Sequence, residues 1–148
     1  PDWMQLSGLI HDLGKIMYIF GDSQQGTSMV KQWVIVGDTF IVGCQLPNTL
    51  VYPEFNNLHP DKDHHIYDTH YGMYNPECGL DQLFCTWRHD EYLYQVLKYN
   101  NCPLPKEGYY LIRYHSLYPW HDKGSYLHLM SFQDKDLLHL LRRFNSYA

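Results

Sequence analysis

The sequence has no long apolar run and few basic residues. No apolar stretch approaches the roughly 20 residues that cross a bilayer, and no charged-then-apolar leader precedes a small-residue cleavage site. Lys and Arg number 11 against 16 Asp and Glu, so the net charge is -5. Such a charge does not attract nucleic acid or anionic membranes. We therefore expect a cytoplasmic protein that binds neither nucleic acid nor membrane.

Paired cysteines are also missing. The four cysteines, Cys44, Cys78, Cys85 and Cys102, form no Cys-x-x-Cys motif, which disfavours a structural zinc site. A chain of this size does not need disulfides to fold, so we expect reduced thiols. No glycine-rich dinucleotide-binding motif occurs either, which argues against a nucleotide cofactor.

The 148 residues are 45% hydrophobic and 16% aromatic, enough for one domain with its own core. Apolar residues recur at three- and four-residue steps over 3–20, 78–99, 105–119 and 131–144, which predicts four helices. Pro105 is placed to open the third helix and Pro119 to close it. Residues 131–134, Ser-Phe-Gln-Asp, resemble a capping box at the start of the fourth.

Two β-prone runs, residues 33–36 and 39–42, flank Gly37 and Asp38, a two-residue hairpin signal. Residues 22–32 and 43–76 lack a sustained period and read as loops. The sequence therefore predicts an all-α fold, a helical bundle with one short β-hairpin.

His11 and Asp12 lie side by side on an otherwise apolar helix. A buried carboxylate needs a partner, so Asp12 suggests a metal ion or a strong hydrogen-bond donor. Gly8 and Gly14 would let a neighbouring helix approach. The alternative is an exposed polar pair near the end of the helix, and the dipeptide alone does not decide between the two.

His89 and His115 fall on two further predicted helices. Each alone would more often be a core histidine than a ligand. Together with His11 and Asp12 they form a helix-borne His/Asp set, the arrangement from which helical bundles build two-metal centres. Nitrogen and carboxylate ligands favour iron, manganese or zinc, without choosing among them.

The remaining histidines carry weaker signals. His59, His64, His65 and His70 lie in the long loop, where solvation is the expected fate. His121 is also assigned to a loop. His128 and His139 fall among leucines, where packing or a helix surface is expected.

Five blocks follow one another along the chain. They are residues 11–15 (His-Asp-Leu-Gly-Lys), 36–40 (Val-Gly-Asp-Thr-Phe), 78–81 (Cys-Gly-Leu-Asp), 87–92 (Trp-Arg-His-Asp-Glu-Tyr) and 113–121 (Arg-Tyr-His-Ser-Leu-Tyr-Pro-Trp-His). A His-Asp dipeptide is common to the His-Asp domain superfamily, whereas Gly-Asp-Thr-Phe and Tyr-Pro-Trp-His are more particular. With these blocks the chain resembles the myo-inositol oxygenases over nearly its whole length.

The resemblance implies a His-Asp-type helical enzyme with two iron ions as a mixed-valent Fe(II)/Fe(III) pair. It implies that the metal ligands include His11, Asp12, His89 and His115. Asp12 would bridge the two irons, with His89 and His115 on the second. The implied protein is a cytoplasmic monomer that opens myo-inositol with dioxygen to D-glucuronate.

The resemblance also implies a substrate site. Lys15, one helical turn beyond His11, would be the catalytic residue that meets a substrate hydroxyl or alkoxide. Gly37, Asp38, His115 and Ser116 would contact the polyol as well.

The chain departs from the family pattern at its ends and in one loop. Family members carry another histidine ligand upstream of the His-Asp pair, and a carboxylate ligand where Ala148 stands here. The loop 23–32 is longer than usual in the family. We therefore expect a domain truncated at both ends, which would hold iron weakly on its own.

Two alternatives remain open. A His-Asp metal-dependent phosphohydrolase would activate water on a metal pair, but it would need clustered Arg and Lys around the metal helix, where only Lys15 is near. A degenerate relative would keep the scaffold without catalysis, and Ala148 is the residue that favours it.

Overall fold

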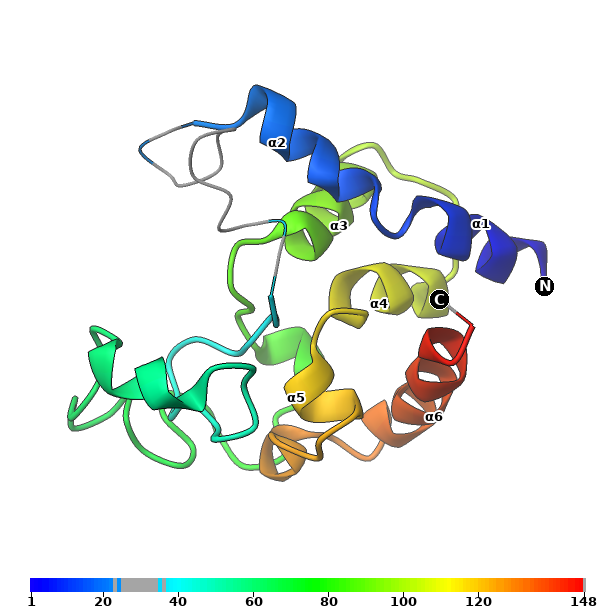
Figure 1. Cartoon of the computed structure of the whole chain (residues 1–148). Helices are drawn as coiled ribbons and strands as arrows, with labels where there is room; N and C mark the ends of the chain where they lie inside the picture. Colours follow the sequence, from blue (N-terminus) through cyan, green and yellow to red (C-terminus); the bar gives the residue numbers. More distant parts are fainter. Residues whose placement is uncertain (23, 25–34, 36, 148) are drawn as a thin grey trace. The chain divides into compact units, whose positions relative to one another are not determined.

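The computed structural model describes residues 1–22, 24, 35 and 37–147 (Figure 1). Its contacts divide the chain into two compact units. The first unit comprises Pro1–Gly37, Trp87–Ser116 and Arg143–Ala148, and the second unit comprises Asp38–Thr86 and Leu117–Arg142. Helices and loops make up both, with no named strand among the described residues, so the all-α prediction is confirmed.

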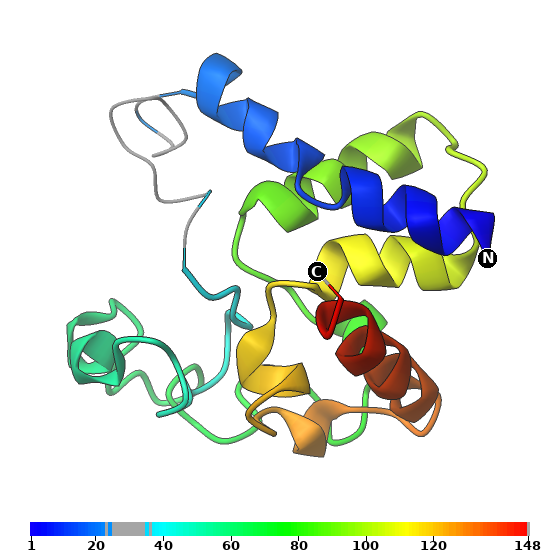
Figure 2. The same cartoon turned by 45° about the vertical axis from the view of Figure 1, so that its right-hand side comes forward.

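The first unit is built from two helix layers. Its elements are α1 (Asp2–Ile10), the 3-10 helix η1 (Leu13–Ile16), α2 (Met17–Phe20), α3 (His89–Tyr99) and α4 (Lys106–Tyr114). In Figures 1 and 2, α1 lies along α4 while η1 lies along α3, and α3 and α4 pack on each other. Residues 1–22 therefore cover both helices of the α3–α4 pair.

The single helix predicted over residues 3–20 is wrong. The chain leaves α1 at His11 and Asp12 and continues as a 3-10 turn. A 3-10 helix has three residues per turn instead of 3.6, so the apolar stripe does not continue on one face. Leu9 and Phe20 are accordingly 83% and 76% exposed. The break places His11 and Asp12 at a turn.

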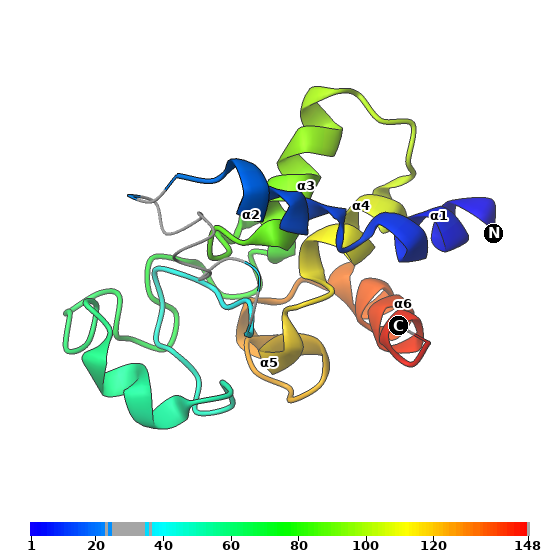
Figure 3. The ribbon, with the colours of Figure 1, turned by 45° about the horizontal axis from the view of Figure 1, so that its top comes forward.

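The start of α4 agrees with the prediction, whereas the start of α3 does not. Pro105 is the N-cap of α4 as predicted, since a proline lacks the N–H that a helix start leaves unpaired. The helix predicted from residue 78 starts only at His89. Leu80, the first residue of the 3-10 helix η3 (Leu80–Gln82), and Leu83, which caps it, are instead fully buried. Figure 3 shows the connection that closes one end of the α3–α4 pair.

The second unit contains mostly loops around an apolar core. Its helical elements are η2 (Pro53–Leu58), η3, α5 (Tyr118–His121), η4 (Leu127–Leu129) and the start of α6 (Asp134–Asn145). The core includes Ile41, Leu80, Leu83, Leu117, Trp120 and Leu129. Pro119 sits in the first turn of α5 and does not simply end the preceding helix as predicted.

The start of α6 confirms the predicted capping box in modified form. The Ser131 amide donates to Asp134 Oδ2 at 2.8 Å, as a capping box requires. The Ser131 hydroxyl donates to the same oxygen at 2.8 Å, and so does the Leu80 amide at 3.1 Å. One carboxylate therefore caps α6 and fastens η3 to it.

The second run of the predicted hairpin does not form a strand. Ile41 makes an isolated antiparallel bridge with Cys85, and the Val42 amide donates to the Phe84 carbonyl at 2.9 Å. Residues 39–42 therefore pair with residues 84–86, which is a long-range contact that no local pattern reveals. The first run, 33–36, lies almost entirely outside the described residues, with the exception of residue 35.

Residues 43–76 form the predicted loop, with η2 as an added turn. Gly72 lets two parts of it cross, because a Cβ there would overlap the Gly43 carbonyl oxygen. The Met73 amide donates to that oxygen at 2.9 Å. Within the described part of the chain, every helix is too short or too polar to cross a membrane.

Candidate metal centre

Three histidines and one aspartate converge in the first unit. Asp12 Oδ1 lies 3.3 Å from His89 Nε2 and 3.6 Å from His115 Nε2, and Asp12 Oδ2 lies 3.8 Å from His11 Nε2. The Nε2 atoms of His89 and His115 are 3.1 Å apart. The predicted convergence of residues from separate helical segments is thus present. One carboxylate lies among all three rings.

Backbone carbonyls fix the orientation of two of these rings. His11 Nδ1 donates to the Gly8 carbonyl at 2.7 Å, and His115 Nδ1 donates to the Ile112 carbonyl at 2.8 Å. A carbonyl can only accept, so in the neutral ring the Nε2 atom carries the lone pair. Both lone pairs then face Asp12, as metal-binding histidines require.

Such an arrangement of acceptors needs a cation between them. Two imidazole lone pairs and a carboxylate repel one another unless a proton or a metal ion lies in their midst. When a proton fills that role, hydrogen bonding from the His115 ring holds the pKa of Asp12 well below its usual range. Partial burial opposes this shift, and Lys15 reinforces it.

The spacing of the donor atoms suits a metal ion. Two atoms bound at about 2.1 Å from one ion lie roughly 3.0–4.2 Å apart, and the separations between the histidine Nε2 atoms and the Asp12 oxygens and between the Nε2 atoms of His89 and His115 run from 3.1 to 3.8 Å. His11, Asp12 and His115 offer one ligand atom each within a span of 4.8 Å. The residues of this site therefore fit a bound metal.

The family model described as myo-inositol oxygenase matches residues 1–148. The chain belongs to the myo-inositol oxygenase family. It is 46% identical to an inositol oxygenase of Mus musculus and 44% identical to one of Danio rerio, each over 147 residues. It is 42% identical to inositol oxygenase 1 of Arabidopsis thaliana over 148 residues.

These matches cover 99% of the chain but only 45–50% of each relative. The chain thus spans about half the length of the curated relatives that it matches. The five blocks that suggested the family lie within the matched residues, so family membership inferred from them is confirmed.

Two of the predicted substrate-site residues, Lys15 and Ser116, lie next to the His/Asp set. Lys15 Nζ donates to Asp12 Oδ2 at 2.6 Å, and the Lys15 side chain is 43% exposed. The Ser116 hydroxyl lies 3.5 Å from His89 Nε2. Both residues therefore adjoin the candidate ligands, Lys15 from the solvent side and Ser116 from the buried side.

The predicted substrate residues at positions 37 and 38 have different surroundings. A Cβ at Gly37 would lie 3.4 Å from the guanidinium of Arg88, the residue that precedes His89. Asp38 belongs to the second unit, where its carboxylate accepts a hydrogen bond from the Val51 amide at 3.0 Å. A role for either in substrate binding stays a prediction.

Gly14 is where the predicted close approach occurs. A Cβ on Gly14 would overlap the His89 carbonyl oxygen, so η1 can meet the start of α3 only with glycine at this position. Gly8 has ordinary van der Waals spacing, with Phe144 Cε2 3.5 Å from a Cβ placed there. The glycine at position 14 therefore sets how near Asp12 comes to His89.

Sequence reasoning assigned no role to Asn145. Its side-chain amide donates to the His115 carbonyl at 3.0 Å, which supports the backbone of a candidate ligand from the end of α6. An asparagine near the end of a helical pattern gives no signal of this kind, because only the tertiary fold shows what it contacts.

The other histidines lie outside this set, and one was predicted wrongly. His121 is buried at the end of α5 and not in a solvated loop, because Pro119 starts a helical turn there. His70 is exposed as expected, and its ring stacks on that of His128 at 3.7 Å. His139 lies on the exposed surface of α6.

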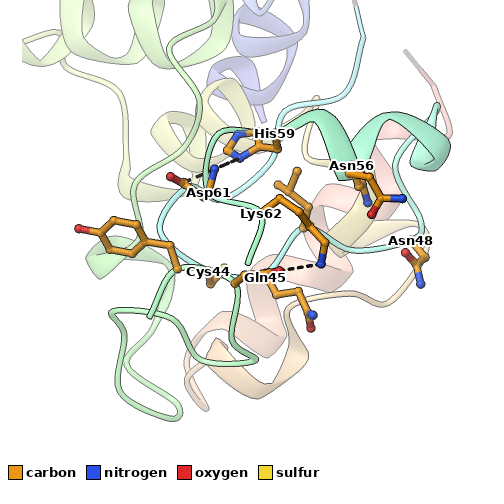
Figure 4. Close-up of a pocket in the computed structure, with 11 residues that line it drawn as sticks. Cys44, Gln45, Asn48, Asn56, His59, Asp61 and Lys62 are labelled. Atoms are coloured by element: carbon orange, nitrogen blue, oxygen red, sulfur yellow. Dashed lines mark hydrogen bonds and ion pairs between the residues drawn. The ribbon is translucent and has the colours of Figure 1, made fainter. Parts of the chain in front are cut away.

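A small polar cavity occurs within the second unit (Figure 4). Its volume is about 90 Å³, and its lining includes Gln45, Asn56, His59, Asp61 and Lys62. Ligand pockets usually measure about 300–1,000 Å³, so this cavity is too small for a six-membered polyol ring. It has room for a few water molecules.

Proposed function

We propose that the protein containing this chain is an inositol oxygenase that converts myo-inositol and dioxygen to D-glucuronate and water. Family membership and the convergence of His11, Asp12, His89 and His115 support this proposal. The reaction balances without another reductant: C6H12O6 and O2 give C6H10O7 and H2O. Both oxygen atoms accept the four electrons that the ring loses.

The carboxylate of Asp12 is suited to bridge two iron ions. Its Oδ1 faces His89 and His115, whereas its Oδ2 faces His11. We infer that His11 and Asp12 would hold one iron and that Asp12, His89 and His115 would hold the other. A mixed-valent pair would supply Lewis acidity toward substrate oxygens and electrons for dioxygen activation.

The neighbouring side chains have roles of their own in this proposal. Myo-inositol is neutral and offers only hydroxyl donors and acceptors, so recognition requires hydrogen bonds. Lys15, exposed on one side and bonded to Asp12, can donate to a substrate hydroxyl and stabilise its alkoxide. Ser116 lies behind His89 and can donate or accept there.

A single assay tests the function. The protein would be loaded anaerobically with Fe(II) and cysteine, mixed with myo-inositol, exposed to oxygen and assayed for D-glucuronate. We expect glucuronate from wild type and none from His115→Ala. His139→Ala, an exposed histidine of α6, is the matched control and should retain activity.

The same preparation can disprove the proposal. Phosphate release from nucleotides in place of glucuronate would indicate the phosphohydrolase chemistry of the wider superfamily. Two irons bound without either product would indicate a non-catalytic relative. Either result would overturn the oxygenase assignment for this protein.

A further inference from the structure

A buried ion pair joins α3 to α4 beside the candidate ligands. Arg113 Nε donates to Glu91 Oε2 at 2.6 Å, and each side chain is only 9% exposed. Glu91 stands two residues after His89, and Arg113 stands two residues before His115. The pair is therefore the next link between the two helices after the histidines themselves.

Further polar and aromatic groups hold this pair in place. Gln95 donates to Glu91 Oε1 at 2.6 Å, so both carboxylate oxygens have a partner. Arg113 also donates to the Tyr114 hydroxyl at 2.8 Å, and its guanidinium lies 4.6 Å from the centre of the Tyr94 ring. Because Arg113 presents its donors in a rigid fork, these partners fix its orientation as well as its charge.

The pair fixes the register of α3 against α4. Contacts between His89 and His115, Glu91 and Arg113, and Leu97 and Tyr109 show that the helices run antiparallel. The ion pair lies about 3 Å along each axis from the histidines, and the Tyr109 contact lies about 12 Å away along α3 and about 9 Å along α4. A shift of one residue between the helices would move the two Nε2 atoms by about 1.5 Å relative to each other.

Stability alone does not account for such a pair. Replacing a buried ion pair by apolar side chains of similar volume is often neutral or stabilising, although removing one partner is damaging. Groups that orient metal ligands, in contrast, change metal affinity by about 10- to 100-fold when they are mutated. These two effects can be separated by experiment.

We propose that Glu91 and Arg113 are positioning residues that hold His89 and His115 in register for metal binding. The inference rests on the metal centre of the proposed function. It adds two residues that touch neither metal nor substrate and act through the packing of α3 on α4.

A double-mutant cycle distinguishes positioning from stability. Glu91→Met and Arg113→Met would be compared with the double variant by thermal unfolding without metal and by Co(II) titration followed in the visible spectrum. Each single variant should lose about 10 °C in Tm. The double variant should regain most of that loss, yet bind Co(II) about 10- to 100-fold more weakly than wild type.

Two further variants keep the test decisive. Arg113→Lys retains the charge without the Nε donor and should weaken Co(II) binding about tenfold with a smaller change in Tm. Tyr109→Phe removes the hydroxyl that bonds to the Cys102 carbonyl at 2.7 Å, at the other end of the same helix pair. It should lower Tm with less than about a twofold change in affinity.

The outcomes distinguish failure of the positioning role from failure of the proposed metal centre. If the wild-type form of the whole protein that contains this chain fails to bind Co(II), the metal centre and this proposal both fail. If wild type binds and the double variant or Arg113→Lys binds equally well, the positioning role alone is overturned. The same holds if the affinity simply follows Tm across all five variants.

Discussion

The two units of the chain bury different kinds of side chain. In the first unit, buried charged or titratable groups include His89, Asp90, Glu91, Arg113 and His115. In the second unit the buried core is mostly apolar, with His121 and Asp134 as buried titratable side chains, and the ion pair between Lys62 and Asp68 lies at the surface. Burying a charge requires a partner in a fixed position, so the first unit carries groups whose mutual geometry is specified.

The histidines of the His/Asp set also contrast with those of the long loop. His89 and His115 are buried on helices, and each has a close ring or carboxylate neighbour. His64 and His65 lie in the long loop of the second unit, where their rings stack 4.6 Å apart. Among the described residues, the histidine-rich loop therefore forms no group of three candidate metal ligands, whereas His11 and His115, which are distant in sequence, form one with Asp12.

The largest effect should come from removing the shared carboxylate. Asp12→Ala should weaken Co(II) binding by more than about 100-fold, since losing a ligand exceeds the effect of losing an outer partner. Asp61→Ala, the same change in the second unit, should leave affinity unaltered. A parallel Co(II) titration of both variants checks this, and equal affinities would place the metal elsewhere.

The next effect concerns the close approach of η1 and α3. Gly14→Ala puts a Cβ within 2.8 Å of the His89 carbonyl carbon, and such overpacking should lower the free energy of unfolding by about 3 kcal/mol. Gly8→Ala lies in α1 with ordinary spacing and should raise it by roughly 0.5–1 kcal/mol. Urea unfolding measures both. A neutral Gly14→Ala would mean that η1 does not pack as described.

In the second unit, Asp134 attaches the start of α6 to η3. Asp134→Ala removes the acceptor shared by the Leu80 and Ser131 amides and should cost about 2–3 kcal/mol because buried donors lose their partner. Asp136→Ala, exposed in the same first turn, should cost less than about 0.5 kcal/mol. Denaturant midpoints for the two variants would be indistinguishable if the cap were unimportant.

The smallest of these effects is a loss of stability in alkali, and it belongs to the second unit. Burial raises the pKa of the Cys44 thiol from 9.0 to about 12 and that of the Tyr74 phenol from 10.0 to about 12. The folded state therefore holds protons that the unfolded state releases. The stability that these two groups contribute is fully present below pH 9 and is lost as the pH rises toward 12.

Between pH 9 and 10.5 the free energy of unfolding should decrease by about 2 kcal/mol. Urea midpoints across this interval give the slope, and Cys44→Ala should flatten it. A constant midpoint in wild type would show that neither group is buried in its neutral form.

The sequence predicted helix boundaries best where a local signal marks the start of the helix. Pro105 and Asp134 stand at the starts of α4 and α6, because a proline or a carboxylate satisfies or avoids unpaired N–H groups within one turn. The predicted helices over 3–20 and 78–99 were too long. Apolar residues there keep a helical spacing, but contacts with the rest of the chain decide where each helix starts and ends.

The candidate site was predictable in part for a related reason. His11, Asp12, His89 and His115 were found because their residue types carry metal chemistry and the surrounding blocks resemble a known family. Glu91 and Arg113 were present in those blocks without an assigned role. Their function depends on which residue of α4 faces which residue of α3, and the sequence does not state that register.

By itself the sequence determined the all-α class, the starts of α4 and α6, the family and the set of candidate ligands, because these depend on residue type and local spacing. Only the tertiary structure decided that the chain turns at His11 and Asp12 and that residues 39–42 pair with residues 84–86. It alone also showed that Asp12 directs one oxygen to His11 and the other to His89 and His115. Such contacts join residues far apart in the chain, and their geometry comes from packing, which no short stretch of sequence encodes.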